Sequence, residues 1–270
     1  MGGQPLSPVA ALFDAVAPVY ETVGPPFFDH FGALLVEYAG VRRGDRVLDL
    51  AAGSGAVTVP ALAAAGPAGG LLAVDIAPGM VERLAERLSS TGHPAARVEL
   101  GDAAGLEVDP GCFDVVLCGF ALFLLPEPVS ALRAWQQAVR PGGTVAVSTW
   151  GREDEVFGAL RDALAELGVE SRPRGEAFDD PAVLAGALSA SGLAEVALST
   201  VALDLRLPHV DALLQWAGTH GGRAWLAQLD AEGRTRLARR LREQWPGEVR
   251  MTWHAHLAAG TCLRPADADL

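Results

Sequence analysis

Residues 46–56 read RVLDLAAGSGA, a short apolar run that ends in an acid and passes into a loop with two glycines. An apolar run of this length is typical of a buried β-strand, and a helical pattern follows it at 57–65. Gly53 and Gly55 allow a ligand to approach the backbone closely, and free N–H groups at a helix start attract a negative group. The stretch therefore predicts a strand–loop–helix unit that holds a ligand, although an ordinary βα turn would also fit this loop alone.

The regions around this unit repeat its pattern of short apolar strands and helices. Further strands are expected at 70–74, 97–100, 113–118 and 144–149, with helices at 78–90 and 126–140. Two long alternating segments, 193–207 and 250–263, add two more strands. Because strands that alternate with helices form parallel sheets covered on both faces, we expect an α/β, Rossmann-like fold with a mostly parallel seven-stranded sheet.

Three regions organise the chain. Residues 1–40 contain amphipathic helices at 9–19 and 27–39 and are expected to form an N-terminal helical lid. Residues 41–150 form the α/β ligand-binding core. Residues 151–270 complete the sheet, add helices at 153–167 and 181–190, and carry an insertion at 208–247. We expect this insertion to be helical, to break at Gly221-Gly222 and at Gly233, and to form a lid over a substrate.

Composition excludes several classes of function. The net charge of −12 disfavours nucleic-acid substrates and anionic membrane surfaces. All 21 basic residues are Arg, so chemistry based on a Lys Schiff base is excluded. The three cysteines lack metal-ligand spacing, and neither a signal peptide nor an 18-residue apolar run is evident. We expect a cytoplasmic monomer or homodimer without a metal site.

Carboxylates at the strand ends indicate which ligand the loop binds. Asp49 would repel a pyrophosphate but attract a cationic amino group, and Thr58 stands where a dinucleotide motif has its third glycine. Asp75, 20 residues beyond Gly55, ends the second strand, where a carboxylate accepts hydrogen bonds from both ribose hydroxyls. Asp102 follows the third strand and is placed to accept from an adenine amino group. Together these residues predict S-adenosylmethionine.

At these residues the chain resembles the UbiE-like class I methyltransferases, in particular the aklanonic acid methyltransferase-type small-molecule enzymes of polyketide pathways. The matching motifs cover residues 9 to about 150 and include FDxxAPxY at 13–20, GDRVLD at 44–49, VDIAPGM at 74–80 and RPGG at 140–143. Ala51 stands where the family commonly has Gly. CGFA at 118–121 replaces the Asn/Asp-Pro-Pro-Tyr motif of amine and nucleic-acid methylation, which disfavours N-methylation.

The resemblance implies how individual residues hold the cofactor. The backbone at Ala51, Gly53 and Gly55 would pass its methionine part, while Asp49 would bind its amino group and Asp75 its ribose. The remaining contacts implied are Ile76 and Met80 against the adenine faces, Asp102 and Ala103 at its polar edge, Tyr20 as a cover, and Cys118 and Gly119 near the methyl group.

The residues that would act on or bind the substrate have fewer sequence signals than those for the cofactor. Methyl transfer from a sulfonium depends mainly on alignment, and a base assists when the acceptor is a hydroxyl or an enol. We favour His220 as that base because His220-Gly221-Gly222 interrupts the helices as a lid loop would, and Tyr20 is a second catalytic candidate. The other histidines considered as bases, each explained equally well as a surface or core residue, are His30, His209, His254 and His256. Aromatic residues proposed for an apolar substrate pocket are Phe27, Phe28, Phe120, Phe123, Trp150, Trp216 and Trp225.

The leading hypothesis is an S-adenosylmethionine-dependent O- or C-methyltransferase acting on an apolar, polyketide-like molecule in secondary metabolism such as antibiotic biosynthesis. S-adenosylhomocysteine would be its product. A first alternative is a cyclase of the same fold that binds the cofactor as a structural support and catalyses a pericyclic reaction. A second is a non-catalytic protein that binds the cofactor, which a filled pocket beside the cofactor sulfur would favour.

Overall fold

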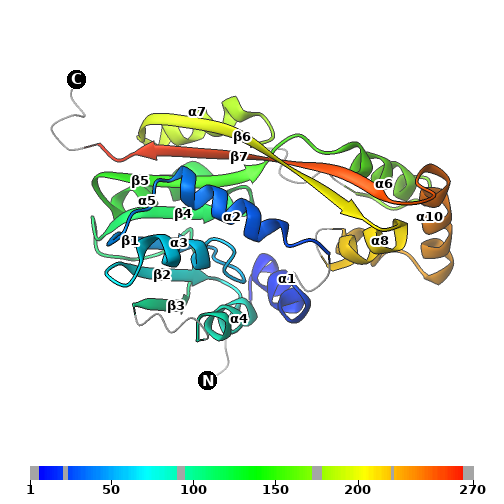
Figure 1. Ribbon diagram of the computed structural model, residues 1–270, viewed down its shortest axis with the longest axis horizontal. Helices are drawn as coiled ribbons and strands as arrows, with labels where there is room; N and C mark the ends of the chain where they lie inside the picture. The colour runs from blue at the N-terminus through cyan, green and yellow to red at the C-terminus, as the bar shows by residue number, and fades with distance from the viewer. Residues whose placement is uncertain (1–5, 21–23, 90–94, 172–177, 220–221, 264–270) are drawn as a thin grey trace.

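The computed structural model describes residues 6–20, 24–89, 95–171, 178–219 and 222–263. These residues form one seven-stranded sheet in the order β3-β2-β1-β4-β5-β7-β6, in which only β7 runs antiparallel to its neighbours (Figure 1). The strands are β1 (Arg46–Leu50), β2 (Gly70–Asp75), β3 (Ala96–Leu100), β4 (Phe113–Gly119), β5 (Val139–Trp150), β6 (Ala194–Leu207) and β7 (Val249–Thr261). The expected α/β class and mostly parallel seven-stranded sheet are confirmed.

Helices cover both faces of this sheet, which explains why the central strands are apolar without interruption. Successive residues of β1 point to opposite faces. Val47 packs in a core with α2 (Phe27–Tyr38), α3 (Thr58–Ala65) and α4 (Pro78–Ser89). Leu48 packs on the other side in a core with α5 (Pro128–Ala138) and α7 (Pro181–Ser191). Both side chains are 1% exposed or less, so β1 is held firmly where its loop begins.

The N-terminal segment is fastened to α4. It consists of α1 (Pro8–Val16), which Ser7 caps through Ala10 N–H, and the 3₁₀-helix η1 (Ala17–Val19). Gly79 N–H in the first turn of α4 donates to Asp14 Oδ1 at 2.7 Å. Arg83 donates to the carbonyl of Ala17 at 3.2 Å and to that of Tyr20 at 2.8 Å. These bonds hold the N-terminal helices beside the carboxyl end of β2.

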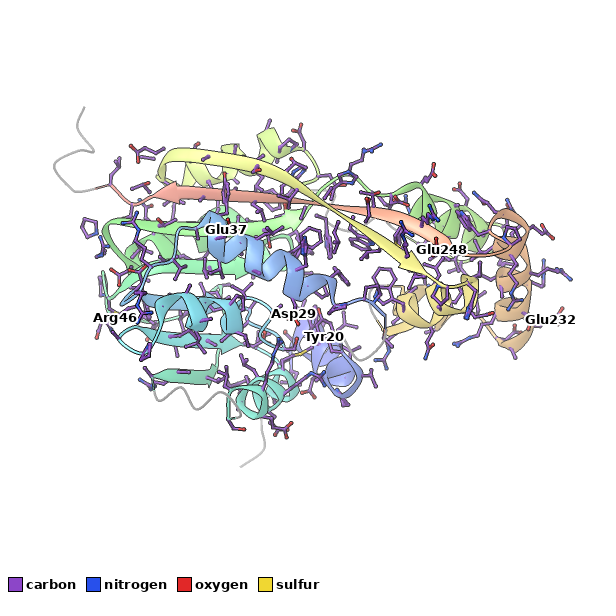
Figure 2. The ribbon with its side chains drawn as sticks, in the orientation of Figure 1. Tyr20, Asp29, Glu37, Arg46, Glu232 and Glu248 are labelled. Atoms are coloured by element: carbon purple, nitrogen blue, oxygen red, sulfur yellow. The ribbon has the colours of Figure 1, made fainter. Side chains whose placement is uncertain are left out.

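The last two strands reach far past the rest of the sheet. Pairing of β5 with β7 ends at Trp150↔Ala255, whereas β6 and β7 remain paired to Leu207↔Val249. This extension carries a helical cap of α6 (Glu155–Ala165), α8 (Val210–Thr219), α9 (Arg223–Leu226) and α10 (Ala231–Gln244). Figure 2 shows Glu232 and Glu248 at this end of the molecule, opposite Arg46. Among the described helices none has the length and apolarity needed to cross a bilayer.

Two expectations about helix ends were wrong. The helix expected at 126–140 ends at Ala138, because Val139 pairs with Phe113 and begins β5 before a register shift in that ladder. Gly233 does not break the last helix but lies in the first turn of α10, where its N–H donates to the cap residue Asp230 at 2.7 Å. The break at Gly222 is present, since that residue precedes α9, while Gly221 lies outside the described residues.

Candidate active site

A cavity of about 750 Å³ lies at the carboxyl ends of the parallel strands. Its floor is formed where the strands end, by Ala51 after β1, Asp75 in β2, Gly119 in β4 and Trp150 in β5. Residues of α1 and of the α8–α9 region close the opposite side. Ligands of open α/β sheets bind at this edge, and the volume falls within the ~300–1,000 Å³ typical of small-molecule sites.

The loop after β1 adopts left-handed backbone angles that its glycines make accessible. Gly53 has φ 55° and Gly55 has φ 95°. A Cβ at Gly55 would lie 2.5 Å from Leu84 Cδ1, so a side chain at this position would require the buried Leu84 side chain to move. Ala51 is also left-handed, at φ 54°, although it carries a side chain. This angle is strained for a residue that carries a side chain, and such strain is concentrated at functional sites.

Asp75 joins this loop to the end of β2. Its Oδ2 accepts from Gly53 N–H at 2.8 Å and its Oδ1 accepts from Ala77 N–H at 2.9 Å. Burial raises the pKa of this carboxyl, and the backbone hydrogen bonds act in the opposite direction. Because each carboxylate oxygen has a second lone pair and Asp75 lines the cavity, it retains the capacity to accept from two hydroxyl groups.

Asp49 lies beneath the loop rather than on the cavity wall. The carboxyl is fully buried, and its Oδ2 accepts from Thr58 Oγ1 at 2.5 Å. Its Oδ1 has no hydrogen-bond partner among the described residues. Burial raises its pKa to about 7; the Thr58 hydrogen bond lowers the pKa, and the nearby Asp75 charge raises it. A buried acceptor without a partner is costly, so this carboxylate fits the ammonium of S-adenosylmethionine, directly or through water.

The residues proposed to contact adenine lie in the segments that follow β2 and β3. Ile76, Met80, Asp102 and Ala103 all line the cavity. Met80 is 1% exposed and packs with Val16 and Ala17 of the N-terminal segment, so this segment covers the same end of the cavity. Asp102 Oδ1 accepts from Ala104 N–H at 2.9 Å, and this exposed carboxylate lines the cavity.

Three residues proposed from the sequence to contact the cofactor do not line the cavity: Asp49, which lies beneath the loop, Gly55 and Cys118. Gly55 is buried against Leu84. Cys118 is fully buried in β4, where burial raises the pKa of its thiol, while the neighbouring Gly119 does line the cavity. The structure therefore places Gly119, and not the Cys118 side chain, at the surface that a cofactor would meet.

The aromatic residues proposed for a substrate pocket divide into two groups. Phe28, Phe120, Phe123 and Trp150 line the cavity, with Phe120 and Trp150 ring centroids 4.3 Å apart. Phe120, at φ 52°, is a second strained residue on the cavity wall. The other residues, which belong to the core behind this wall, are Phe27, Trp216 and Trp225, 2%, 1% and 8% exposed.

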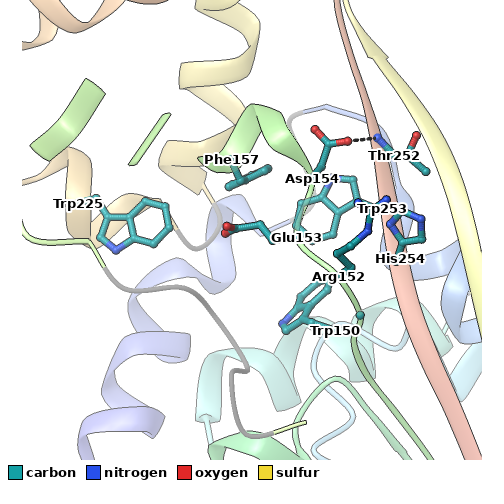
Figure 3. Close-up of a pocket in the computed structure, with 10 residues that line it drawn as sticks. Trp150, Arg152, Glu153, Asp154, Phe157, Trp225, Thr252, Trp253 and His254 are labelled. Carbon is teal, nitrogen blue, oxygen red and sulfur yellow. Dashed lines mark hydrogen bonds between the residues drawn. The ribbon is translucent and has the colours of Figure 1, made fainter. Parts of the chain in front are cut away.

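Of the candidate bases, Tyr20 lines the cavity, with its ring stacked on Phe28 at 5.7 Å. His220 lies outside the described residues. His256 is structural: it is buried and bonds Thr200 Oγ1 at 2.8 Å and the Asp179 carbonyl at 3.0 Å. His254 lines a separate cavity of about 40 Å³ beside Trp253 (Figure 3). The remaining two, His30 and His209, are exposed.

Sequence reasoning expected lids from residues 1–40 and 208–247 but did not name the residues of α1 and of the α8–α9 region that line the cavity. Leu12 and Phe13 line it from α1, and Thr219, Arg223 and Ala224 line it from the α8–α9 region. Amphipathic spacing marked both regions as helical, but the position of one helix face against a distant sheet edge is a long-range property. Only Arg223 carries a charge that could have marked it in advance.

Comparisons with known proteins agree with this geometry. A family model described as "Methyltransferase domain" matches residues 47–143. Nocamycin O-methyltransferase of Saccharothrix syringae is 30% identical over 246 residues, 85% of this chain and 88% of that protein. Aklanonic acid methyltransferase DauC of Streptomyces sp. (strain C5) is 30% identical over 141 residues, 52% of this chain and 64% of that protein. The solved (4+2)-cyclase SpnF shares the fold with a TM-score of 0.59 at 17% identity, over 97% of this chain and all of that one.

The strand-end carboxylates, the glycine loop and the sheet order define the class I fold that binds S-adenosylmethionine. The chain belongs to the S-adenosylmethionine-dependent methyltransferases, the family that contains nocamycin O-methyltransferase. Its cofactor supplies an electrophilic methyl group on a sulfonium.

Proposed function

We propose that this enzyme transfers the methyl group to an oxygen or carbon atom of an apolar, polyketide-like small molecule in secondary metabolism. The observation that carries the proposal is that one cavity joins the carboxylates Asp75 and Asp102 to the aromatic wall around Phe120 and Trp150. An apolar molecule would thus lie in contact with the cofactor. The names of the two relatives, both methyltransferases and one an O-methyltransferase, support oxygen as the acceptor.

In this proposal the protein acts mainly by holding and aligning the two reactants. Asp49, the loop of Ala51 and Gly53, and Asp75 hold the methionine and ribose parts, and Ile76, Met80, Asp102 and Ala103 hold the adenine. Fixing the acceptor in line with the methyl–sulfur bond replaces a bimolecular encounter by a unimolecular step. Residues 1–40 and 208–247 act as lids over the core of 41–150, and Tyr20 or His220 assists the removal of a proton.

A cyclase that uses the cofactor only as a support is the second candidate. In its favour, the side chains that titrate among the described lining residues are Tyr20, Asp75, Asp102 and Arg223, and no histidine is among them. The likeness to SpnF concerns the fold alone. A filled pocket beside the cofactor sulfur would favour a non-catalytic binding protein, and a cavity that extends from the proposed cofactor contacts to the aromatic wall disfavours it.

The remaining expectations concern where and how the enzyme works. The three cysteines are all free in the structure, which supports the proposal of a reducing compartment, the cytoplasm. The proposed substrate is a small molecule, neither nucleic acid nor membrane, and the protein is proposed to act as a monomer or homodimer.

The deciding experiment incubates the enzyme with candidate pathway intermediates and methyl-labelled S-adenosylmethionine, in parallel with S-adenosylhomocysteine. Methyl transfer puts the label into the product and stops when S-adenosylhomocysteine replaces the donor. A product of unchanged mass, formed equally well with S-adenosylhomocysteine, would overturn the transferase and establish the cyclase. Asp75→Ala should abolish turnover whether the enzyme is a transferase or a cyclase. The matched control is Asp109→Ala, which changes an exposed acid that lies off the cavity.

A further inference from the structure

The charges on the cavity wall are unevenly distributed. Among the described lining residues Asp75 and Asp102 are acidic, and Arg223 is the single cation. Asp75 and Asp102 lie at the strand ends on the proposed cofactor side, while Arg223 enters from the start of α9 together with Thr219 and Ala224. Arg223 therefore lies on the part of the wall that the proposed cofactor contacts leave to the substrate.

The guanidinium of Arg223 is little used by the protein. In the part of the chain that the structure describes, its hydrogen bond runs from Nη1 to the Ala15 carbonyl of α1, at a long 3.4 Å. A guanidinium has five N–H donors arranged to bind a carboxylate through two parallel hydrogen bonds. Arg223 is exposed and lines the cavity, so most of these donors remain available to a ligand at the cavity mouth.

Several other arginines of this chain form ion pairs with carboxylates. Arg87 pairs with Asp29 at 3.1 Å, Arg161 pairs with Glu153, and Arg242 pairs with Asp211 at 2.5 Å. No such ion pair with a carboxylate is found for Arg223 within the described residues. In a protein with a net charge of −12, a cation on the cavity wall without an acidic partner is suited to an anion supplied from outside.

We propose that Arg223 binds an acidic group of the substrate, a carboxylate or an equally acidic enolate, so that the enzyme selects apolar organic acids. This inference rests on the proposed function, because it assumes that the substrate shares the cavity with the cofactor. Arg223 also contacts α1 through Ala15, so an acid bound at Arg223 connects the two sides of the cavity mouth. The aromatic wall favours the rings of such an acid, and Arg223 distinguishes the acid from its neutral derivatives.

The test measures binding of 2-naphthoate and of 2-naphthamide, a neutral probe of the same shape, to protein saturated with S-adenosylhomocysteine. Calorimetry with the wild type should show the acid bound about tenfold more tightly than the amide, as expected for a charge-assisted hydrogen-bonded pair. Arg223→Gln should remove this preference by weakening the acid alone. Arg223→Lys should keep part of it, and Arg239→Gln, on the exposed face of α10 and off the cavity, should leave it unchanged.

Equal affinity of the wild type for both probes, or no detectable binding of the acid, would overturn the inference. An Arg223→Gln variant that weakens both probes alike would also overturn it, since a purely structural role through Ala15 affects any ligand of the cavity. The affinity for S-adenosylhomocysteine separates this result from a failure of the proposed function. If label transfer succeeds but the acid preference is absent, only the role of Arg223 fails; if the preference is present without label transfer, only the transferase fails.

Discussion

The cofactor edge of the sheet and the helical cap are built by different kinds of interaction. At the cofactor edge, backbone groups make the main contacts. Gly53 N–H and Ala77 N–H donate hydrogen bonds to the Asp75 carboxylate, at 2.8 and 2.9 Å. Where the cap meets the rest of the molecule, large side chains make the contacts: the ring centroid of Phe27 in α2 lies 5.1 Å from that of Trp253 in β7 and 5.5 Å from that of Trp216 in α8. The first region depends on a few short motifs, and the second on contacts between residues more than 180 positions apart.

This difference determines which substitutions each region tolerates. A loop held by backbone hydrogen bonds and left-handed glycines tolerates few changes, so it presents the same surface to the same cofactor. An aromatic wall keeps its apolar character through many substitutions of similar volume, while the shape of the cavity changes. Under the proposed function, we therefore expect the aromatic wall, and not the glycine loop, to determine which substrate binds.

The largest expected effect distinguishes aromatic residues that belong to the hydrophobic core from those that line the cavity. Phe27, which is 2% exposed, contacts the rings of Trp150, Trp216 and Trp253, so Phe27→Ala should lower the free energy of unfolding by about 3–5 kcal/mol. Phe123 is half-buried on the cavity wall, and Phe123→Ala should instead weaken binding of an apolar probe. Chemical denaturation measures the first effect and calorimetry with 2-naphthamide measures the second.

The affinity for S-adenosylhomocysteine is the control for both variants, because neither side chain belongs to the proposed cofactor contacts. Equal losses of stability in the two variants would mean that the wall is continuous core and that the division between core and lining is wrong. Phe28→Leu, which keeps an apolar side chain on the wall, should lie between wild type and Phe123→Ala in probe affinity.

The same contrast explains how much could be predicted from the sequence. The class of fold, six of the seven strands to within a residue or two, and the order Asp49, Asp75, Asp102 followed from apolar runs that end in acids, which are local patterns. The start of β5 was missed because Val139 joins the sheet through a partner, Phe113, that local reading does not supply. The assignment of Phe27 and Trp216 to a core behind the wall, and of Arg223 to the wall itself, depends on how the cap packs and has no local signature.

A second prediction concerns the pH dependence of the cofactor edge. Burial raises the pKa of Asp49 in the folded protein to about 7, well above the ordinary value of an aspartate. The folded state therefore favours the protonated acid, so this group's contribution to stability is fully present below pH 4 and is lost as the pH rises toward 7. A bound ammonium favours the ionised acid, so binding should release a proton and strengthen with pH.

We expect the affinity for S-adenosylhomocysteine to rise about 20-fold between pH 5.5 and 7.5, from the change in the ionised fraction of one such group. Calorimetry in buffers of different ionisation enthalpy measures both the affinity and the proton release. Asp49→Asn should remove the dependence and leave weak binding throughout, while Asp102→Asn, an exposed acid on the same cavity, should retain it. A flat profile in the wild type would show that the ammonium is held elsewhere.

The smallest expected effect lies where the two regions meet, at the attachment of α1 to α4. Asp14 caps α4 through Gly79 N–H, and the segment it anchors packs on Met80 at the adenine end of the cavity. Asp14→Ala should cost about 1 kcal/mol, the usual cost of losing a helix cap, and weaken cofactor binding about threefold to fivefold. Hydrogen exchange across residues 8–19 should accelerate, while Glu82→Ala, exposed on the same helix, should change neither measurement.

Arg83→Gln provides an independent form of this test, because it removes the bonds to the Ala17 and Tyr20 carbonyls and leaves the cap at Gly79 intact. If α1 and η1 cover the cofactor as one unit, Arg83→Gln should accelerate exchange over the same residues as Asp14→Ala. Faster exchange with no loss of cofactor affinity in either variant would instead show that the N-terminal segment covers the substrate alone. The boundary between the cofactor edge and the substrate side would then lie at Met80, and α1 would belong functionally with the cap.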